Sequence, residues 1–154
     1  MQKQQNNMKT SVRNIADAYR ILGNAKVTKL EVSEVIEVAK ARKSMRQIAE
    51  DFEWYEKDCQ EKLKYDGFDN DMQLYQSLLN KAHQGKLKDI TEEENEAANR
   101  IQEYDSKVKK ASDEEGLKEA DIEENLLKAE TVAKLYVENG WKMSTFDKVN
   151  FFSV

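Results

Sequence analysis

The most constraining feature of the sequence is a long apolar stripe in its first half. Apolar side chains recur at steps of three and four residues over this stretch: Val38, Ala41, Met45, Ile48, Phe52, Tyr55 and Cys59. This spacing is typical of one face of an α-helix, and no glycine or proline interrupts it between Lys29 and Gly67. The stripe predicts one unbroken helix from about Lys29 to about Lys64, about 35 residues and roughly 50 Å long. Its apolar edge must be covered by the rest of the chain or by a second copy.

Shorter helices are predicted on both sides of this long helix. The chain has no proline and five glycines, so few residues interrupt helices. Capping residues, apolar spacing and the glycines Gly23, Gly85 and Gly140 indicate helices at about residues 10–23, 69–85, 91–108, 129–140 and 144–152. Thr28 with Glu31, and Thr91 with Glu94, have the spacing of capping boxes. The predicted fold class is all-α, an elongated helical bundle with one long helix and about five shorter ones.

Residues 112–127 break this helical pattern. Gly116 and the acidic run Asp113–Glu115 indicate a loop, and Ile122 to Leu127 fits either the start of the next helix or an extended link. Residues 1–9 are polar and are expected to be frayed. Because 154 residues are close to the common size of one domain, residues 10–154 are expected to form a single helical domain.

The formal net charge of −5 is unevenly distributed along the chain. Residues 1–65 contain 13 Lys or Arg and 10 Asp or Glu, whereas residues 66–154 contain 12 and 20. The two halves are therefore expected to attract each other, or the opposite half of a second copy. The acidic pI of 5.1 disfavours non-specific binding of duplex nucleic acid, whose phosphates are also negative.

No targeting or membrane segment is indicated. The first ten residues contain no apolar run typical of a secretory signal, and no stretch approaches the length of apolar sequence that spans a membrane. The single cysteine, Cys59, has no partner for an intramolecular disulfide, which fits a reducing compartment. We expect a cytoplasmic protein in a bacterial cell.

The residues that catalysis or metal binding needs are scarce. The only histidine, His83, lies near a predicted helix end, where a capping or surface role is expected. Cys59 lies on the apolar stripe and is expected to be a small buried apolar side chain. The run Asp66–Asp71 lacks the closing glutamate of a calcium loop, and the glycines are too far apart for a phosphate loop. We therefore expect no catalytic residue, metal or cofactor, and a protein that is not an enzyme.

Two groups of residues are candidates for binding. Five basic residues around the start of the long helix form a candidate anion site: Lys26, Lys29, Arg42, Lys43 and Arg46. They would bind a nucleotide phosphate or an acidic partner, or form a solvated face that pairs with the acidic half of the chain. Four aromatic residues form a candidate partner-binding segment: Trp141, Phe146, Phe151 and Phe152. This segment either folds back as a lid on the core or docks on a neighbouring subunit or partner.

Part of the first half resembles a known group of proteins. Three segments are similar to small helical proteins encoded by phages and mobile elements of gut bacteria: Gly23–Lys29, Lys40–Arg42 and Gln60–Lys64. The resemblance lies within residues 12–65. It implies a phage product in a bacterial cytoplasm, and it assigns no activity to any residue of this chain.

Two functions are expected from these observations. The first is a non-enzymatic, oligomeric helical protein of phage origin that works by binding, as a virion component or an accessory factor. The alternative is a phage counter-defence protein that sequesters a small anionic nucleotide or blocks a host defence protein. A metal-dependent hydrolase or nuclease is a third, less favoured hypothesis. The expected partners are a second copy of the chain, a host or phage protein, or a small anionic nucleotide, and no membrane.

Overall fold

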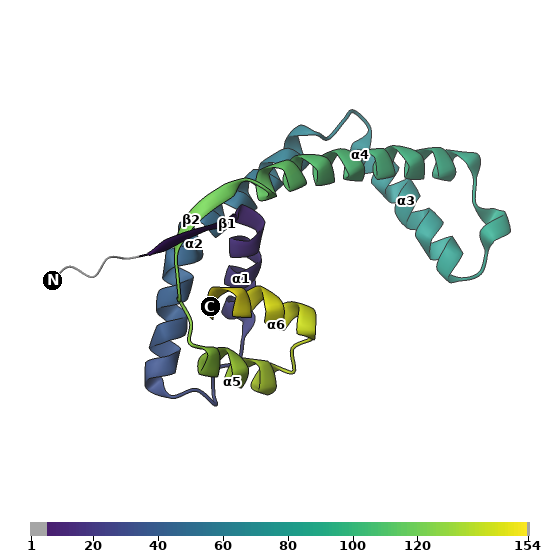
Figure 1. The fold of residues 1–154 in the computed structure, drawn as a ribbon. Helices are drawn as coiled ribbons and strands as arrows, with labels where there is room; N and C mark the ends of the chain where they lie inside the picture. The colour runs from purple at the N-terminus through teal and green to yellow at the C-terminus, as the bar shows by residue number, and fades with distance from the viewer. Residues whose placement is uncertain (1–5, 154) are drawn as a thin grey trace. The chain divides into compact units, whose positions relative to one another are not determined.

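The computed structural model describes residues 6–153, and within that range the chain is built mainly of six α-helices (Figure 1). The helices are α1 (Val12–Asn24), α2 (Val32–Lys62), α3 (Phe68–His83), α4 (Glu92–Gly116), α5 (Ala129–Asn139) and α6 (Met143–Asn150). Two strands, β1 (Asn7–Ser11) and β2 (Glu119–Glu123), and two 3-10 helices, η1 (Leu87–Asp89) and η2 (Phe151–Ser153), complete the elements. The prediction of an all-α fold with one long helix is confirmed, because α2 is continuous over 31 residues. Within residues 6–153, no helix combines the length and the apolar content that crossing a membrane requires.

Contacts along the chain divide it into two compact units. Unit 1 combines the described residues up to Trp54 with those from Glu115 onward, and unit 2 is the segment Tyr55–Glu114. The boundaries fall inside α2 and inside α4. The expectation of a single helical domain at residues 10–154 stays a prediction, which the cooperativity of unfolding tests.

Unit 1 has a closed apolar core. Helices α1, α2, α5 and α6 all contribute to it, and α6 packs on both α1 and α5 (Figure 1). Its most deeply buried side chains include Ile15, Met45, Leu135, Val149 and Phe152. The part of the predicted stripe from Val38 to Phe52 faces this core, as its spacing predicts.

A short antiparallel ribbon closes one side of unit 1. Strand β1 pairs with β2 in the register Met8 to Ile122 and Thr10 to Ala120. Alternate residues of a strand share one face, so Ile122 is buried and Met8 packs beside it on the core. The expectation that residues 1–9 are frayed is therefore wrong for residues 7–9, and residues 1–5 lie outside the described range. Of the alternatives for residues 122–127, the extended link is the one observed at its start.

The C-terminal aromatic segment folds back on the core of unit 1. The Phe152 side chain is fully buried, and its carbonyl accepts the Leu127 N–H at 3.3 Å. Trp141 and Phe146 are partly buried against the same core, whereas Phe151 remains 45% exposed. The lid alternative is thus the observed one. Phe152 in particular is not available as a partner-binding residue, because its ring fills the interior of its own unit.

Unit 2 consists of α3, most of α4 and the last turns of α2. Its buried apolar residues lie mostly on α4: Ala97, Ala98, Ile101 and Tyr104. The Tyr104 hydroxyl donates to the Gln60 carbonyl of α2 at 2.6 Å, and Ser112 donates to Glu56 at 2.8 Å. Of these four buried apolar side chains, two are alanines and Tyr104 carries a hydroxyl. Unit 2 therefore has a much smaller apolar core than unit 1.

The start of α4 forms as its sequence predicts. The Glu94 N–H donates to the Thr91 hydroxyl at 3.1 Å, and the Thr91 N–H donates to the Glu94 carboxylate at 2.9 Å. This reciprocal pair is the predicted capping box. At the other end the helix continues to Gly116, so the loop that the sequence predicts at Asp113–Gly116 is wrong.

Candidate interaction surfaces

The turn between α1 and α2 is held by side chains of α5. The Glu138 carboxylate accepts the backbone N–H groups of Thr28 and Lys29, each at 3.0 Å, and also the Thr28 hydroxyl. Asn139 accepts the Lys26 N–H at 2.7 Å and donates to the Lys26 carbonyl at 3.0 Å. The hydrogen bond from the Thr28 hydroxyl is the main reason why the pKa of Glu138 lies below its usual range. These bonds fix the place from which α2 begins.

The first turn of α2 is attached to α5 by an ion pair. Lys134 donates to the nearly buried Glu34 carboxylate at 2.8 Å, which lowers the pKa of Glu34 and raises that of Lys134. The same carboxylate accepts the Glu31 N–H at 3.0 Å. The predicted capping box of Thr28 with Glu31 is therefore wrong, since Glu138 binds Thr28 and the pair that caps α2 is Glu31 with Glu34.

The opposite face of α2 carries a second apolar stripe, here named the outer α2 stripe: Val32, Val35, Ile36 and Ala39. Residues of an α-helix are about 100° apart around its axis, so Ile36 lies about 200° from Glu34, the residue that faces α5. The Val32 and Ile36 side chains are 77% and 48% exposed. Spacing of three, four and seven residues is that of a helix face that packs on another element. The outer α2 stripe is therefore a candidate docking surface.

Basic residues continue the outer α2 stripe toward the C-terminus of the helix. Lys40, Lys43 and Arg46 are all exposed and follow the stripe on the same side of α2. An apolar surface with positive charge at one end favours an apolar partner with negative charge at the matching end.

A shallow depression lies on the outward side of α5, here named the α5 depression. Its volume is about 590 Å³, and five residues line it: Lys29, Ala133, Lys134, Val137 and Glu138. Val137 is 77% exposed, while Thr131 and Leu135 on the inward side of the same helix are fully buried. Lys134 and Glu138 are held in place by their bonds to Glu34 and Thr28, so the rim of the depression is rigidly built.

The five residues of the predicted anion site do not gather around one point. The Arg42 guanidinium stacks on the Tyr19 ring, 4.2 Å from its centroid, and donates to the Tyr19 carbonyl at 3.4 Å. A Cβ atom on Gly23 would lie 2.7 Å from an Arg42 nitrogen, so Gly23 leaves room for this guanidinium. The sequence predicts that Gly23 ends α1, but the helix continues to Asn24.

The other four basic residues lie in two separate places. Lys26 and Lys29 precede α2. Lys43 follows the first residue of α2 by eleven positions, about 16 Å along the helix at about 1.5 Å per residue, and Arg46 lies one turn further. No single phosphate reaches both groups, so the structure gives the predicted nucleotide site no common centre.

Unit 2 contains a network of polar side chains in place of a large apolar core. Arg100 donates to both oxygens of the buried Asp71 carboxylate at 2.7 and 3.0 Å, and the Tyr65 hydroxyl donates to it at 2.7 Å. Arg100 first, and Tyr65 second, lower the pKa of Asp71 to about 2. Burial, followed by the hydrogen bond to Asp71, raises the pKa of Tyr65 to about 12. This network joins α3, α4 and the turn that precedes α3.

A second ion pair with a buried carboxylate joins the far end of α3 to α4. Lys81 donates to Glu94 at 2.6 Å and to the Asp89 carbonyl at 3.0 Å. The Lys81 ammonium, together with the Thr91 N–H, lowers the pKa of Glu94 to about 2. The Glu94 side chain is almost fully buried, whereas the Lys81 side chain is 28% exposed and reaches the surface of unit 2.

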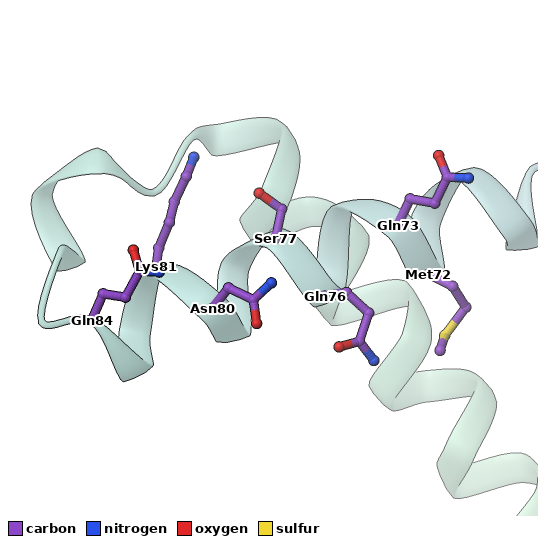
Figure 2. A pocket seen from close by; sticks show the side chains of 7 residues that line it. All are labelled: Met72, Gln73, Gln76, Ser77, Asn80, Lys81 and Gln84. Carbon is purple, nitrogen blue, oxygen red and sulfur yellow. The ribbon is translucent and has the colours of Figure 1, made fainter.

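A wide groove follows α3 on the surface of unit 2. Its volume is about 490 Å³, and Figure 2 shows the seven side chains that line it: Met72, Gln73, Gln76, Ser77, Asn80, Lys81 and Gln84. Four of these are amides, which donate and accept hydrogen bonds but do not titrate. The groove offers polar contacts along one helix and no group suited to proton transfer.

The single histidine and cysteine lie apart from these surfaces. His83 is exposed at the last residue of α3, and Cys59 is half-buried on α2. Among residues 6–153, no cluster of three or more His, Cys, Asp or Glu is placed to hold a metal ion.

Comparison of the chain with protein-family models, with curated proteins and with solved structures finds no match. Its function must therefore be argued from the surfaces themselves.

Proposed function

We propose that this chain is a non-enzymatic protein of phage origin that works by protein–protein binding and self-association in the bacterial cytoplasm, as a virion component or accessory factor. The observation that supports this proposal most directly is the outer α2 stripe. Four apolar side chains at helical spacing point away from a unit that already has a closed core. A surface of this kind is typical of a helix that binds another protein.

Three further features favour binding over catalysis. The polar networks of unit 2 hold helices together, and their acidic groups are bound to Arg100, Lys81 and backbone N–H groups. The hydrogen bonds from the Thr28 and Lys29 N–H groups to Glu138 hold the α1–α2 turn, and with it the start of α2, in one position. The groove on α3 has no titratable group besides Lys81, which is already paired.

Size-exclusion chromatography with multi-angle light scattering tests this proposal. The intact chain is loaded over a concentration range from about 5 to about 500 μM, which brackets dissociation constants typical of reversible oligomers. We expect a mass that rises above 17.9 kDa with concentration. A constant mass of 17.9 kDa throughout would overturn self-association.

A further inference from the structure

Unit 1 carries two apolar surfaces that match each other. We propose that the outer α2 stripe of one copy packs, antiparallel, on the α5 depression of a second copy. This inference rests on the proposed self-association and names its interface. The two surfaces lie on different sides of the α2–α5 contact, because Glu34 and Thr131 face that contact whereas Ile36 and Val137 face away from it. A copy therefore does not cover its own stripe with its own α5.

The apolar residues of the two surfaces have the same spacing. Val32 and Ile36 are four residues apart on α2, and Ala133 and Val137 are four residues apart on α5. Four residues correspond to about 6 Å along either helix. When the helices run antiparallel, Val32 lies opposite Val137 and Ile36 lies opposite Ala133. The alanine and the depression beside it leave room for the larger isoleucine side chain.

The charges that flank the apolar residues favour the antiparallel direction. Lys43 lies beyond the C-terminal end of the outer α2 stripe, and Glu130 lies beyond Ala133 toward the N-terminus of α5. The antiparallel arrangement places these opposite charges at the same end. At the other end it places Glu31 near both Lys29 and Glu138 on the rim of the depression, so this end has no strong preference for either direction. A parallel arrangement would instead separate Lys43 from Glu130, so the pairing of these two residues is what favours the antiparallel direction.

When two different surfaces form the interface, every dimer still has one unoccupied outer α2 stripe and one unoccupied α5 depression. Such head-to-tail contacts continue into a ring or a filament, whereas a contact between identical surfaces stops at a dimer. The proposed interface therefore accounts for an assembly of more than two copies without any further surface.

A mixing experiment distinguishes this interface from other modes of association. The variants Ile36→Glu and Val137→Glu each place a charge on one of the two surfaces and leave the other intact. Both side chains are exposed, so the fold is retained, which far-UV circular dichroism checks. We expect each variant alone to remain at 17.9 kDa, and an equimolar mixture to form a species of twice that mass and nothing longer.

The matched control is Leu87→Glu in unit 2, because the exposure of Leu87, 66%, lies between those of Ile36 and Val137. We expect this variant to associate like the unmodified chain. If the unmodified chain associates and Ile36→Glu or Val137→Glu associates equally well alone, the inference is wrong while self-association stands. The same conclusion follows if the equimolar mixture stays monomeric. If the unmodified chain is itself monomeric, the proposed function and the inference fall together.

A charge exchange tests the direction of packing. Lys43→Glu and Glu130→Lys are each expected to weaken association by about two- to fivefold, the range of exposed ion pairs. The double variant restores the original charge pairing in the reverse sense and is expected to recover most of that loss. Additive weakening in the double variant would exclude the antiparallel arrangement.

Discussion

Unit 1 and unit 2 are both helical, but different forces hold them together. Unit 1 buries large apolar side chains from four α-helices and from η2, including Ile15, Met45 and Phe152. Unit 2 buries two carboxylates, Asp71 and Glu94, beside only four buried apolar residues, two of which are alanines. Apolar burial is non-directional and insensitive to pH, whereas buried ion pairs need both partners in the correct protonation state. We therefore expect the two units to respond differently to core truncation, to charge removal and to acid.

The largest effect is expected from truncation of the core of unit 1. Phe152→Ala removes a fully buried ring and is expected to lower the free energy of unfolding by about 3–5 kcal/mol. Phe151→Ala is the matched control, since the neighbouring ring is 45% exposed and its loss is expected to cost about 1 kcal/mol or less. Urea unfolding followed by circular dichroism measures both. Equal losses in the two variants would show that the C-terminal segment is not part of the core.

A smaller effect, confined to unit 2, is expected from removal of the Asp71 charge. Asp71→Asn keeps the shape of the side chain and leaves Arg100 without its anionic partner. We expect faster amide hydrogen exchange in α3 and α4 and unchanged exchange in α1 and α6. Asp69→Asn is the control, because Asp69 is exposed on the same helix. If the two variants exchange alike, the Asp71 network does not stabilise unit 2.

The smallest effect is expected at the start of α4. Thr91→Ala removes the hydroxyl that accepts the Glu94 N–H, and loss of such a cap costs about 1 kcal/mol. Thr91→Ser keeps the hydroxyl and is expected to be neutral within a few tenths of a kcal/mol. Urea titrations of the two variants give this difference directly. A Ser variant as unstable as the Ala variant would contradict the capping role.

The elements that were predictable from the sequence are those set by neighbouring residues. The stripe from Val38 to Phe52 predicts α2, and Thr91 with Glu94 predicts the start of α4. Gly140 has a φ of 58° after the last residue of α5, the left-handed conformation expected of a glycine that ends a helix. In each case the decisive contacts lie within one or two turns of the chain.

The features that were not predicted depend on residues far apart in the sequence. Thr28 has the local spacing of a helix cap, but a carboxylate 110 residues away binds it instead. Met8 pairs with Ile122, although the sequence near Met8 indicates no strand and the sequence near Ile122 fits a helix start as well as an extended link. Gly23 follows an apolar stripe like a glycine that ends a helix, but its lack of a side chain leaves room for the Arg42 guanidinium from another helix. Tertiary contacts outweigh local signals at these positions.

The outer α2 stripe was visible in the sequence but was masked by a stronger pattern. Val32, Ile36 and Ala39 have helical spacing of their own. The longer stripe on the opposite face of the same helix dominates the apolar periodicity. The outer α2 stripe can be recognised only when the structure shows which apolar residues of α2 are buried and which are exposed. The residues of the candidate anion site lie apart in one chain for a related reason: Arg42 and Lys43 are neighbours in sequence, but their side chains leave the helix in different directions.

The contrast between the units is tested most directly by residue-resolved hydrogen exchange at pH 6 and at pH 2.5. The pKa values of Asp71 and Glu94 are about 2 in the folded chain, below their ordinary values near 4. Their contribution to stability is therefore complete above about pH 4.5 and is lost as the pH falls toward 2. Glu34 and Glu138 act in the same direction in unit 1, but the apolar core there does not titrate. After correction for intrinsic exchange rates, we expect α3 and α4 to lose protection at pH 2.5 while α1 and α6 keep it. Equal loss of protection in both units would contradict this account.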